Sequence, residues 1–481
     1  MLIRNTPVSS TLGRPYWPHR AGRHPVARVG VHKGGAWDPS IVRRVLGVVP
    51  HDLPPVSAPV ITIDGIIEND ATAWLREVDA RSGLRRTKTA LTRADSLRAF
   101  LNYVLAQNTS IRGATNAHII GYIRTRTTGP RRVSGNTIAS DRSTIRGFYE
   151  WLRDERGIPL PITLDELRTP NGPVLSMREG RGIPKASAAQ TPLEPPQIAE
   201  LLAAATTRNN GQNYTAARDA AFISLGLACG ARADTLAHLL TYEIPASPRP
   251  TPRNRKPTEG DLIEIRLPAA VSKTNREVVL PAIRRHLDRV RRFINPETGA
   301  RRHQLDRWTP PKNPIRVATG PTATFRGIVD TDGNRRSFNT MTAEDRRRLV
   351  TETNEPAMIF LTVHRGRPLS ERSAEEIVST VSAEAEDRAE QAGTVFPHVT
   401  THDLRGTYAT HLAALFYFGV PTSAGRDLDG KPHRVNIQSA VKMAATGLGH
   451  INARTTQLYI QQVGLMASQY SINAFLGREQ Q

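Results

Sequence analysis

The sequence predicts a mainly α-helical protein with a small β-sheet, built from a smaller all-helical domain and a larger α+β domain. Two observations support this fold class. Apolar residues recur at helical spacing between about residues 65 and 160, and two short strand-like runs follow a segment rich in Pro, Gly and Ser. A chain of 481 residues is long enough for two to four domains, each with its own core.

Composition and periodicity together divide the chain into four parts. We expect a basic, flexible arm at 1–55, a helical domain at 56–168, a linker at 169–192, and a last domain at 193–481. Within the last domain, the stretch near 300–355 has no regular pattern and is expected to be an irregular surface insertion. The arm is rich in Lys, Arg, Pro and Gly, a composition that fits a DNA-tracking arm and a solvated tail equally well.

Two amphipathic helices define the first domain. One apolar stripe follows the i, i+3, i+4, i+7 spacing and comprises Leu97, Phe100, Leu101, Val104 and Leu105. A second helix follows Asn136, and its apolar side comprises Ile138, Ile145, Phe148, Tyr149 and Leu152. Both stripes are interpreted as core. The arginines elsewhere around the second helix are more simply solvated than bound to DNA, and they are Arg142, Arg146 and Arg153.

The last domain combines helical and strand-like runs. A helix is predicted over Tyr214–Ala228, ending at Gly230. Strand-like runs at Leu262–Leu267 and Glu277–Leu280 flank a turn near Lys273–Asn275. The β-sheet of the predicted fold is therefore expected to be a hairpin here.

Charge favours an acidic partner. The chain has 65 Lys and Arg against 44 Asp and Glu, a formal charge of +21, and nucleic acid is the usual partner of such a chain. Cys229 is the single cysteine, so no disulfide or Cys-based zinc site forms within one chain. The longest apolar run, Ala220–Ala231, is shorter than the ~18 residues of a membrane helix. We therefore expect a soluble, cytoplasmic protein associated with the nucleoid and not with a membrane.

The segment THDLRGTYATHL, residues 401–412, contains an anion-binding pattern. Thr401 is a plausible helix N-cap and Asp403 suits the first turn. His402 and Arg405 are three residues apart, on one side of the helix near its N-terminus, where backbone N–H groups and the helix dipole favour an anion. His411 falls about half a turn away from His402 and is interpreted as structural.

A second informative segment is GLGHINARTTQLYI, in which His450 precedes Tyr459 by nine residues. Taken alone, such a tyrosine is usually a packed aromatic residue and such a histidine a loop residue. The order HxxR, LGH, TTxxY, however, resembles the motif set of the tyrosine recombinase (phage integrase) family of site-specific recombinases. Upstream, CGARADTL supplies Arg232 and SKTNREVVLP supplies Lys273, in the order that the family uses.

The resemblance implies a fold and a reaction. The helical domain would be a SAM-like core-binding domain, and residues 193–481 the tyrosine-recombinase catalytic domain. The enzyme would cut and rejoin DNA through a 3′-phosphotyrosyl intermediate, without metal or other cofactor. Its partner would be double-stranded DNA, bound by a homo-tetramer on paired sites, with accessory DNA-bending proteins as further partners. The tail Met466–Gly477 would pack into a neighbouring protomer or within its own chain.

The implied roles agree with the chemistry of an anionic phosphodiester. Arg232, Arg405 and His450 would stabilise the non-bridging oxygens, because charged donors offset the charge that builds up there. Tyr459 would be the nucleophile, His402 the base or proton shuttle, and Lys273 the acid for the departing 5′ oxygen.

This sequence departs from the family pattern at one position near the site and in two stretches that are longer than usual, the insertions near 300–355 and 419–441. Thr235 stands where the family usually has an acid, although Asp234 is adjacent. Two other functions stay open: a type IB topoisomerase, which nicks and reseals with a similar tyrosine, and a catalytically silent DNA-binding protein. An RNA-binding protein is less favoured, because no aromatic-rich strand for base stacking is evident.

Overall fold

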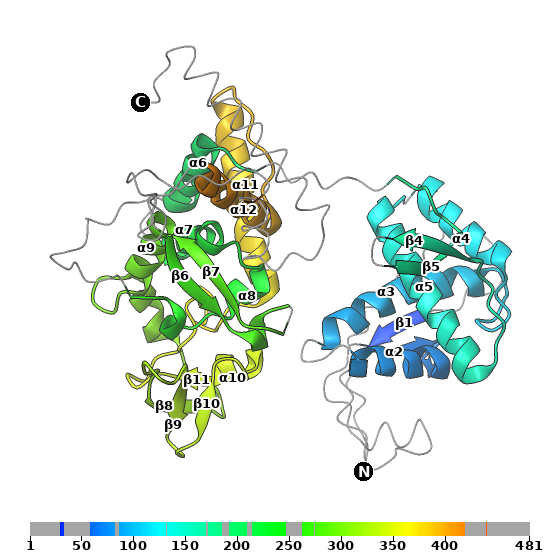
Figure 1. The fold of residues 1–481 in the computed structure, drawn as a ribbon, viewed down its shortest axis with the longest axis horizontal. Coiled ribbons are helices and arrows are strands. Elements are labelled where there is room, and N and C mark those ends of the chain that lie inside the picture. Colours follow the sequence, from blue (N-terminus) through cyan, green and yellow to red (C-terminus); the bar gives the residue numbers. More distant parts are fainter. Residues whose placement is uncertain are drawn as a thin grey trace, which may run out of the picture. The chain divides into compact units, whose positions relative to one another are not determined.

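The computed structural model describes residues 29–32, 58–81, 86–130, 132–169, 172–184, 192–208, 214–246, 262–273, 275–418 and 439. The chain forms two compact units, a first unit of residues 1–188 and a second unit of residues 189–481 (Figure 1). Both are mainly helical, as the sequence predicts, and both contain small sheets, which the sequence predicts only for the second unit. No helix within the described ranges is long and apolar enough to cross a membrane.

Four helices form the body of the first unit: α2 (Asn69–Arg81), α3 (Arg86–Ala106), α4 (Asn116–Thr128) and α5 (Gly135–Arg156). Both predicted apolar stripes face its core, where Phe100 makes edge-to-face contacts with Tyr122 and Tyr149. Helix α5 begins where Ser134 accepts a hydrogen bond from the Thr137 N–H and ends at Gly157, whose φ of 66° suits glycine. Leu105, at the edge of the first stripe, is only partly buried.

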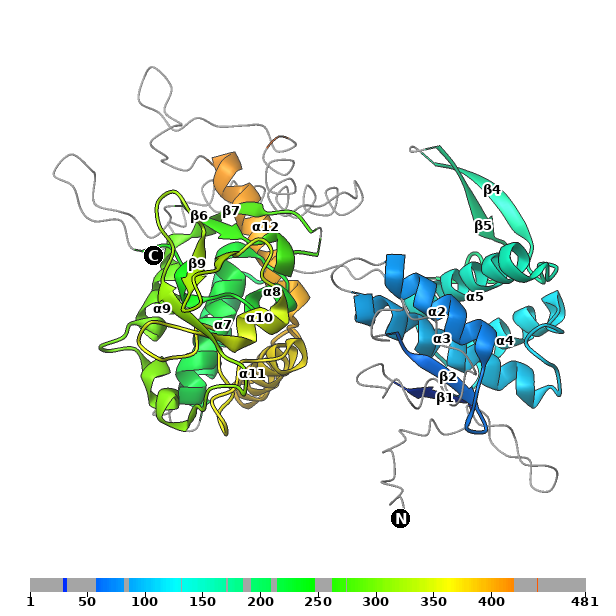
Figure 2. The same cartoon turned by 90° about the horizontal axis from the view of Figure 1, so that it is seen from below.

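Two small sheets complete the first unit. Strands β1 (Val29–His32), β2 (Val60–Ile63) and β3 (Ile66–Ile67) form an antiparallel sheet, and β4 (Leu164–Thr169) pairs with β5 (Gly172–Met177) in a hairpin that projects away from the helices (Figure 2). The predicted arm therefore contains strand β1, and the predicted linker contains strand β5. A strand of four to six residues has too little periodicity to be recognised before its partner is known.

Two arginines of α5 hold the β4–β5 hairpin. Arg142 donates to the carbonyl of Met177, and Arg146 donates to the carbonyl of Leu175 at 2.5 Å. The expectation that these side chains are simply solvated is therefore wrong for Arg142 and Arg146. A guanidinium group can satisfy backbone carbonyls at a strand edge, and the sequence does not reveal that a strand lies beside α5.

The second unit is built around α7 (Tyr214–Cys229), a helix that is buried along almost its whole length. Around it pack α6 (Pro195–Thr207), α9 (Arg284–Ile294), α11 (Glu371–Gln391) and α12 (Thr401–Phe418). The short helix α8 (Ala233–Ala237) follows α7 after a turn at Gly230. Strands β6 (Leu262–Leu267) and β7 (Val278–Ile283) form the predicted hairpin, with Leu267 opposite Val278.

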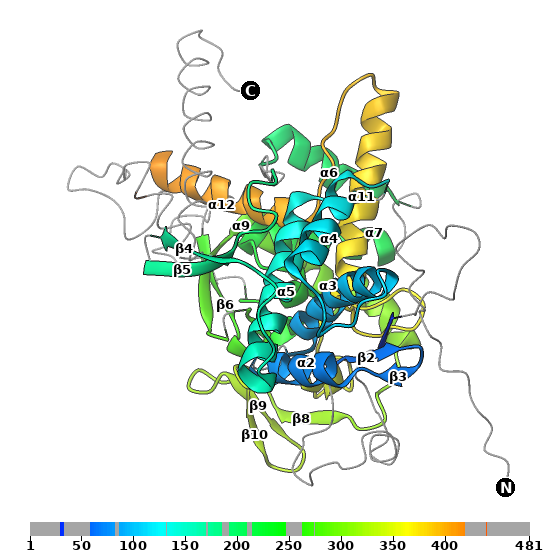
Figure 3. The same cartoon turned by 90° about the vertical axis from the view of Figure 1, so that its right-hand side faces the viewer.

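The segment 300–355 is not irregular, contrary to the prediction. It contains a four-stranded sheet, called the insertion sheet below, at the opposite end of the second unit from α6 (Figure 1, Figure 3). Its strands lie in the order β10 (Arg335–Ser337), β9 (Gly327–Asp330), β8 (Ile315–Thr319), β11 (Leu349–Val350). Segment 300–355 also contains the 3-10 helix η5 (Ala300–Arg307) and helix α10 (Ala343–Arg348), and two further 3-10 helices precede it in the second unit, η3 (Thr241–Glu243) and η4 (Ala269–Val271). The strands are short, and the pairing of β8 with β9 has a register shift. The sequence therefore shows no alternation of apolar and polar residues that would predict this sheet.

A buried ion pair attaches the insertion sheet to the rest of the second unit. Arg346 of α10 and Glu243 of η3 are both fully buried, and their nearest atoms are 2.8 Å apart. Arg346 also donates to the carbonyls of His238 and Phe338 at 3.1 and 2.8 Å. Both buried charges are paired and hydrogen-bonded, so this contact holds the insertion sheet in place. Apolar residues of the insertion sheet also belong to the hydrophobic core of the second unit.

Candidate active site

The N-terminus of α12 carries His402 and Arg405, and it is capped by the residue before the helix. The hydroxyl of Thr400 accepts from the His402 N–H at 3.2 Å, and the Thr400 N–H donates to Asp403 Oδ2 at 2.9 Å. The expected cap, Thr401, is instead the first helical residue. This reciprocal cap fixes the first turn of α12 and therefore the direction in which His402 leaves it.

Arg405 is buried, with 4% of its surface exposed, and is held by the turn between α7 and α8. Its Nη1 donates to the carbonyl oxygen of Gly230 at 2.6 Å. Gly230 has a φ of +59°, and a Cβ built there would lie 2.3 Å from Cδ1 of Tyr408. Only glycine fits this turn, because both its backbone conformation and the ring packed against it exclude a side chain.

Tyr408 joins the same turn to the β6–β7 hairpin. Its ring packs on Gly230, and its hydroxyl donates to the carbonyl of Pro281 at 2.8 Å. Burial raises the pKa of this phenol well above 10, so Tyr408 is a structural group here and stays protonated. One turn of α12 thus fixes both the α7–α8 turn and strand β7.

The structure brings four of the predicted site residues together from separate segments. Arg232 is the residue before α8, Lys273 lies exposed in the loop between β6 and β7, and His402 and Arg405 lie on α12. The pKa of His402 is lowered first by loss of hydration and next by the charge of Arg405. Arg232 and Lys273 lower it further, while Asp403 opposes them. All three cations therefore act on one imidazole.

This arrangement, called the cationic cluster below, suits an anion and a proton acceptor. Positive charges fixed by secondary structure stabilise a negative charge without having to reorganise. A lowered pKa keeps the His402 imidazole neutral near neutral pH, so that it can accept a proton. The side chain of His402 remains exposed and can be reached by a ligand.

Thr235, the departure from the family pattern, makes a contact that sequence reasoning missed. Its buried hydroxyl donates to the carbonyl of Val271 at 2.8 Å, two residues before Lys273. A carboxylate could not donate this hydrogen bond when ionised. The sequence identifies the position as unusual, but only the fold shows that it contacts the loop of Lys273.

Three further reactive side chains of the second unit are structural. Nε2 of His411 lies 3.0 Å from the carbonyl oxygen of Leu193, in agreement with the structural role predicted for it. Burial, helped by neighbouring charges, lowers the pKa of His411 to about 4 and that of His286 to about 3. Burial raises the pKa of the Cys229 thiol to about 12, which makes it a poor nucleophile.

The other predicted site residues, His450 and Tyr459, lie outside the described residues, as does the tail 466–477. Of the predicted insertion at 419–441, the structure describes only Ser439. Among the described residues, no group of three or more His, Cys, Asp or Glu side chains is placed to hold a metal ion.

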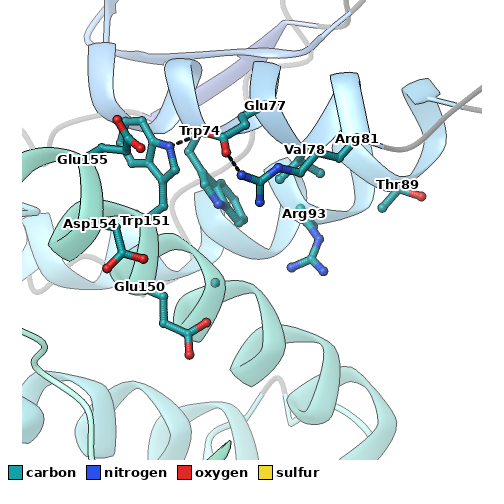
Figure 4. A pocket seen from close by; sticks show the side chains of 11 residues that line it. Trp74, Glu77, Val78, Arg81, Thr89, Arg93, Glu150, Trp151, Asp154 and Glu155 are labelled. Atoms are coloured by element: carbon teal, nitrogen blue, oxygen red, sulfur yellow. Dashed lines mark hydrogen bonds and ion pairs between the residues drawn. The ribbon is translucent and has the colours of Figure 1, made fainter.

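A cavity of about 410 Å³ in the first unit is lined by more acidic than basic residues, unlike the cationic cluster (Figure 4). Trp74 and Trp151 line it, and Glu77 accepts hydrogen bonds from the Trp151 indole and from Arg81. Its remaining charged residues are Arg93, Glu150, Asp154 and Glu155. Because carboxylates outnumber arginines around it, this cavity is a poor site for a phosphate.

Comparison with known proteins identifies the first unit. Residues 71–156, which cover most of α2 to α5, match the family "Phage integrase, N-terminal SAM-like domain". The predicted SAM-like helical domain is therefore confirmed, and with it the resemblance to phage integrases in this part of the chain. No curated protein matches the sequence of the chain.

Solved structures similar to this chain include three structures of two recombinases, XerH and XerA. A XerH site-specific recombinase bound to a palindromic difH substrate, in a post-cleavage complex, has 11% identity and a TM-score of 0.46, over 84% of this chain and 88% of that one. A pre-cleavage complex of XerH with a difH substrate has 12% identity and a TM-score of 0.44, over 82% and 81%. A XerA recombinase has 14% identity and a TM-score of 0.31, over 84% and 98%.

Proposed function

We propose that this chain, in which a phage integrase SAM-like domain precedes the second unit, is a tyrosine-type site-specific DNA recombinase. The observation that carries the proposal is the cationic cluster. Arg232, Lys273, His402 and Arg405 come from three sequence motifs of a recombinase-like pattern, and the charges of the two arginines and the lysine all act on the accessible His402 imidazole. A phosphodiester is the anion that this combination of donors and proton carriers suits best.

The proposed reaction exchanges one phosphate ester for another. The Tyr459 hydroxyl oxygen attacks phosphorus and forms a phosphotyrosyl bond at the 3′ side of the break, while its proton passes to His402. The bond from phosphorus to the 5′ bridging oxygen breaks, and that oxygen takes a proton from the Lys273 ammonium group. Rejoining is the reverse reaction, with a 5′ hydroxyl as the nucleophile. Because the ester bond is conserved, no nucleotide hydrolysis is required.

The two arginines have a different task from the proton carriers. Attack at phosphorus increases the charge on the non-bridging oxygens, and a guanidinium group offers two parallel donors to them at permanent positive charge. The guanidinium group of Arg405 is held by the Gly230 carbonyl, and Arg232 stands at the N-cap position of α8. His450 is proposed as a further donor to the same oxygens.

Double-stranded DNA is the proposed partner. A chain of net charge +21 gains affinity from phosphate contacts, and its SAM-like domain belongs to a family named after integrases. We further propose that a homo-tetramer acts on paired sites, with accessory DNA-bending proteins as additional partners. The cytoplasm, at the nucleoid, is the proposed location.

Trapping of the covalent intermediate tests the proposal. The wild-type protein and its Tyr459→Phe variant are incubated with libraries of nicked duplexes, from which the cleaved strand end diffuses away. Denaturing gels are expected to show a protein–DNA adduct for the wild type and none for Tyr459→Phe. The sequence of the trapped DNA then gives the target site.

Each other outcome has a definite meaning. An adduct that persists in Tyr459→Phe would show that another residue is the nucleophile. DNA binding without any adduct would favour a catalytically silent DNA-binding protein. Relaxation of supercoiled DNA without exchange between two duplexes would favour a type IB topoisomerase.

A further inference from the structure

The loop that carries Lys273 is long for a hairpin and connects the paired residues Leu267 and Val278. It contains the 3-10 helix η4, after which the Asn275 N–H donates to the carbonyl of Ser272 at 3.1 Å. Asn275 itself has a φ of 52°. Local bonds therefore shape the tip of the loop, but they do not fix the loop relative to the rest of the second unit.

Asn339, from the segment that follows strand β10, connects the two arms of this loop. Its Oδ1 accepts from the Ala269 N–H at 2.9 Å, and its Nδ2 donates to Glu277 Oε2 at 2.8 Å. Ala269 stands four residues before Lys273 and Glu277 four residues after it. A single amide side chain thus holds the loop at two points placed symmetrically about the lysine.

Glu277 is in turn held by two arginines. Arg326, which precedes β9, donates to Glu277 Oε2 at 2.9 Å, and Arg266 of β6 lies 3.6 Å from Oε1. The insertion sheet therefore contacts the loop through Arg326 as well as through Asn339. The Thr235 hydroxyl on the Val271 carbonyl is a third point of attachment, from α8.

Asn339 is itself anchored. The residue before it, Phe338, is buried, stacks on Tyr242 and offers its carbonyl to the fully buried Arg346 at 2.8 Å. The Asn339 N–H also donates to the Ser337 hydroxyl at 3.3 Å. Because the buried Arg346–Glu243 pair ties this segment to η3, the position of Asn339 is set by the core of the second unit.

We propose that Asn339 is a positioning residue that holds the Lys273 ammonium group at the departing 5′ oxygen, and that this is the task of the insertion sheet. The inference rests on the proposed function. A general acid acts only within hydrogen-bond reach of the oxygen that it protonates, and a displacement of about 1 Å can cost a factor of about 100 in rate. A loop held on both sides of the lysine meets that requirement without any contact between Asn339 and DNA.

A pair of substrates separates positioning of the acid from general damage to the fold. One nicked duplex has the ordinary scissile phosphate, and the other has sulfur in place of the 5′ bridging oxygen. A thiolate is a much weaker base than an alkoxide, so the sulfur substrate needs no proton from Lys273. Rates of adduct formation are measured for wild type, Lys273→Ala, Asn339→Leu and the neighbouring control Thr340→Ala, whose hydroxyl donates only to Ser337 at 3.2 Å among the contacts described.

We expect Asn339→Leu to slow cleavage of the oxygen substrate about 10- to 100-fold and to leave the sulfur substrate unchanged, the same selectivity that is expected of Lys273→Ala. Thr340→Ala should match wild type on both. If Asn339→Leu does not fold, Asn339→Asp is used, since its carboxylate still accepts from Ala269 but repels Glu277; it should show the same selectivity for the oxygen substrate.

Equal slowing of both substrates, or no slowing of either, would overturn the role of Asn339. Failure of the wild-type protein to form an adduct with either substrate would instead overturn the proposed function. The two failures can be told apart. Overturning the role of Asn339 requires a wild-type protein that forms the adduct, whereas overturning the proposed function requires a wild-type protein that forms none.

Discussion

Two buried arginines, Arg126 in the first unit and Arg405 in the second, carry the same charge in different electrostatic surroundings. Only 6% of Arg126 and 4% of Arg405 is exposed. Arg126 donates to Asp141 Oδ2 through Nε at 3.1 Å and Nη2 at 3.0 Å, and the hydroxyl of Tyr122 donates to the same oxygen. Arg405 donates to the carbonyl of Gly230, and its charge lowers the pKa of His402.

The difference shows how a fold can hold a buried charge for two purposes. The charge of Arg126 is balanced by a carboxylate inside the helical domain, which makes the pair a structural unit. The charge of Arg405 adds to those of Arg232 and Lys273 around a histidine that solvent can reach. Positive charges that act together on one accessible group suit the binding of an anion, whereas the paired charge of Arg126 does not.

The largest effect expected from this comparison is on stability, for Arg126→Ala. Removal of the guanidinium leaves Asp141 buried without its cation, which should lower the free energy of unfolding of the first unit by about 3–5 kcal/mol. Denaturant unfolding measures this loss. Arg372→Ala is the control, because the Arg372 side chain is 88% exposed in its pair with Glu376, and this change should cost less than about 1 kcal/mol.

The double variant Arg126→Met/Asp141→Leu sharpens the test, because removal of both charges should recover most of the lost stability. If Arg126→Ala were as stable as wild type, the view of this pair as a structural unit would be wrong.

The next largest effect is on the reaction, for Arg405→Ala. Loss of one fixed donor to the phosphate should slow formation of the phosphotyrosyl adduct about 100- to 1,000-fold. Arg405→Lys keeps the charge but loses the forked geometry, so it should be intermediate. Thermal unfolding is measured in parallel, since Arg405 also ties α12 to the α7–α8 turn. A variant that loses stability while the folded protein reacts at the normal rate would place Arg405 in the same structural class as Arg126.

Local sequence patterns were enough to predict much of this fold. Helix α7, the two core stripes and the β6–β7 hairpin each have a strong period or a clear terminator, such as Gly230, within a short window. Strand β1 and the insertion sheet have neither. The pairing of Val29 with Ile63 joins residues more than thirty positions apart, and the strands involved are short. The patterns that define such sheets are contacts between segments, and a single sequence does not show them.

The residues of the cationic cluster could be predicted from the sequence, but the residues that hold the Lys273 loop could not. The order of Arg232, Lys273, His402 and Arg405 resembles a known motif set, so these residues could be named from the sequence. Thr235 and Asn339 could not be assigned a role, because their contacts are with segments distant in sequence: Thr235 with the Val271 carbonyl, and Asn339 with the Ala269 N–H and the Glu277 carboxylate. Asn339 belongs to a segment that was expected to be irregular, and a lone asparagine there is ordinarily a loop residue.

The smallest expected effect is a change in the pKa of His402. Its measurement tests whether the charges of Arg232 and Lys273 act on this imidazole. Arg232 and Lys273 both disfavour the protonated imidazole, so Arg232→Gln and Lys273→Gln should each raise the pKa of His402. The acidic limb of any activity that needs neutral His402 then moves to higher pH. The rise should be larger for Arg232→Gln, whose charge acts more strongly on His402 than that of Lys273.

NMR titration of ¹³C-labelled histidines, assigned with His402→Gln, measures the pKa of His402 without requiring activity. Lys312→Gln, in the segment before β8, is the matched control and should leave it unchanged. Added salt should diminish the difference between the variants and wild type, because mobile ions screen exposed charges such as Lys273. A pKa of His402 that is the same in all variants would mean that its low value comes from loss of hydration and Arg405 alone, and Arg232 and Lys273 would then have no electrostatic part in the cluster.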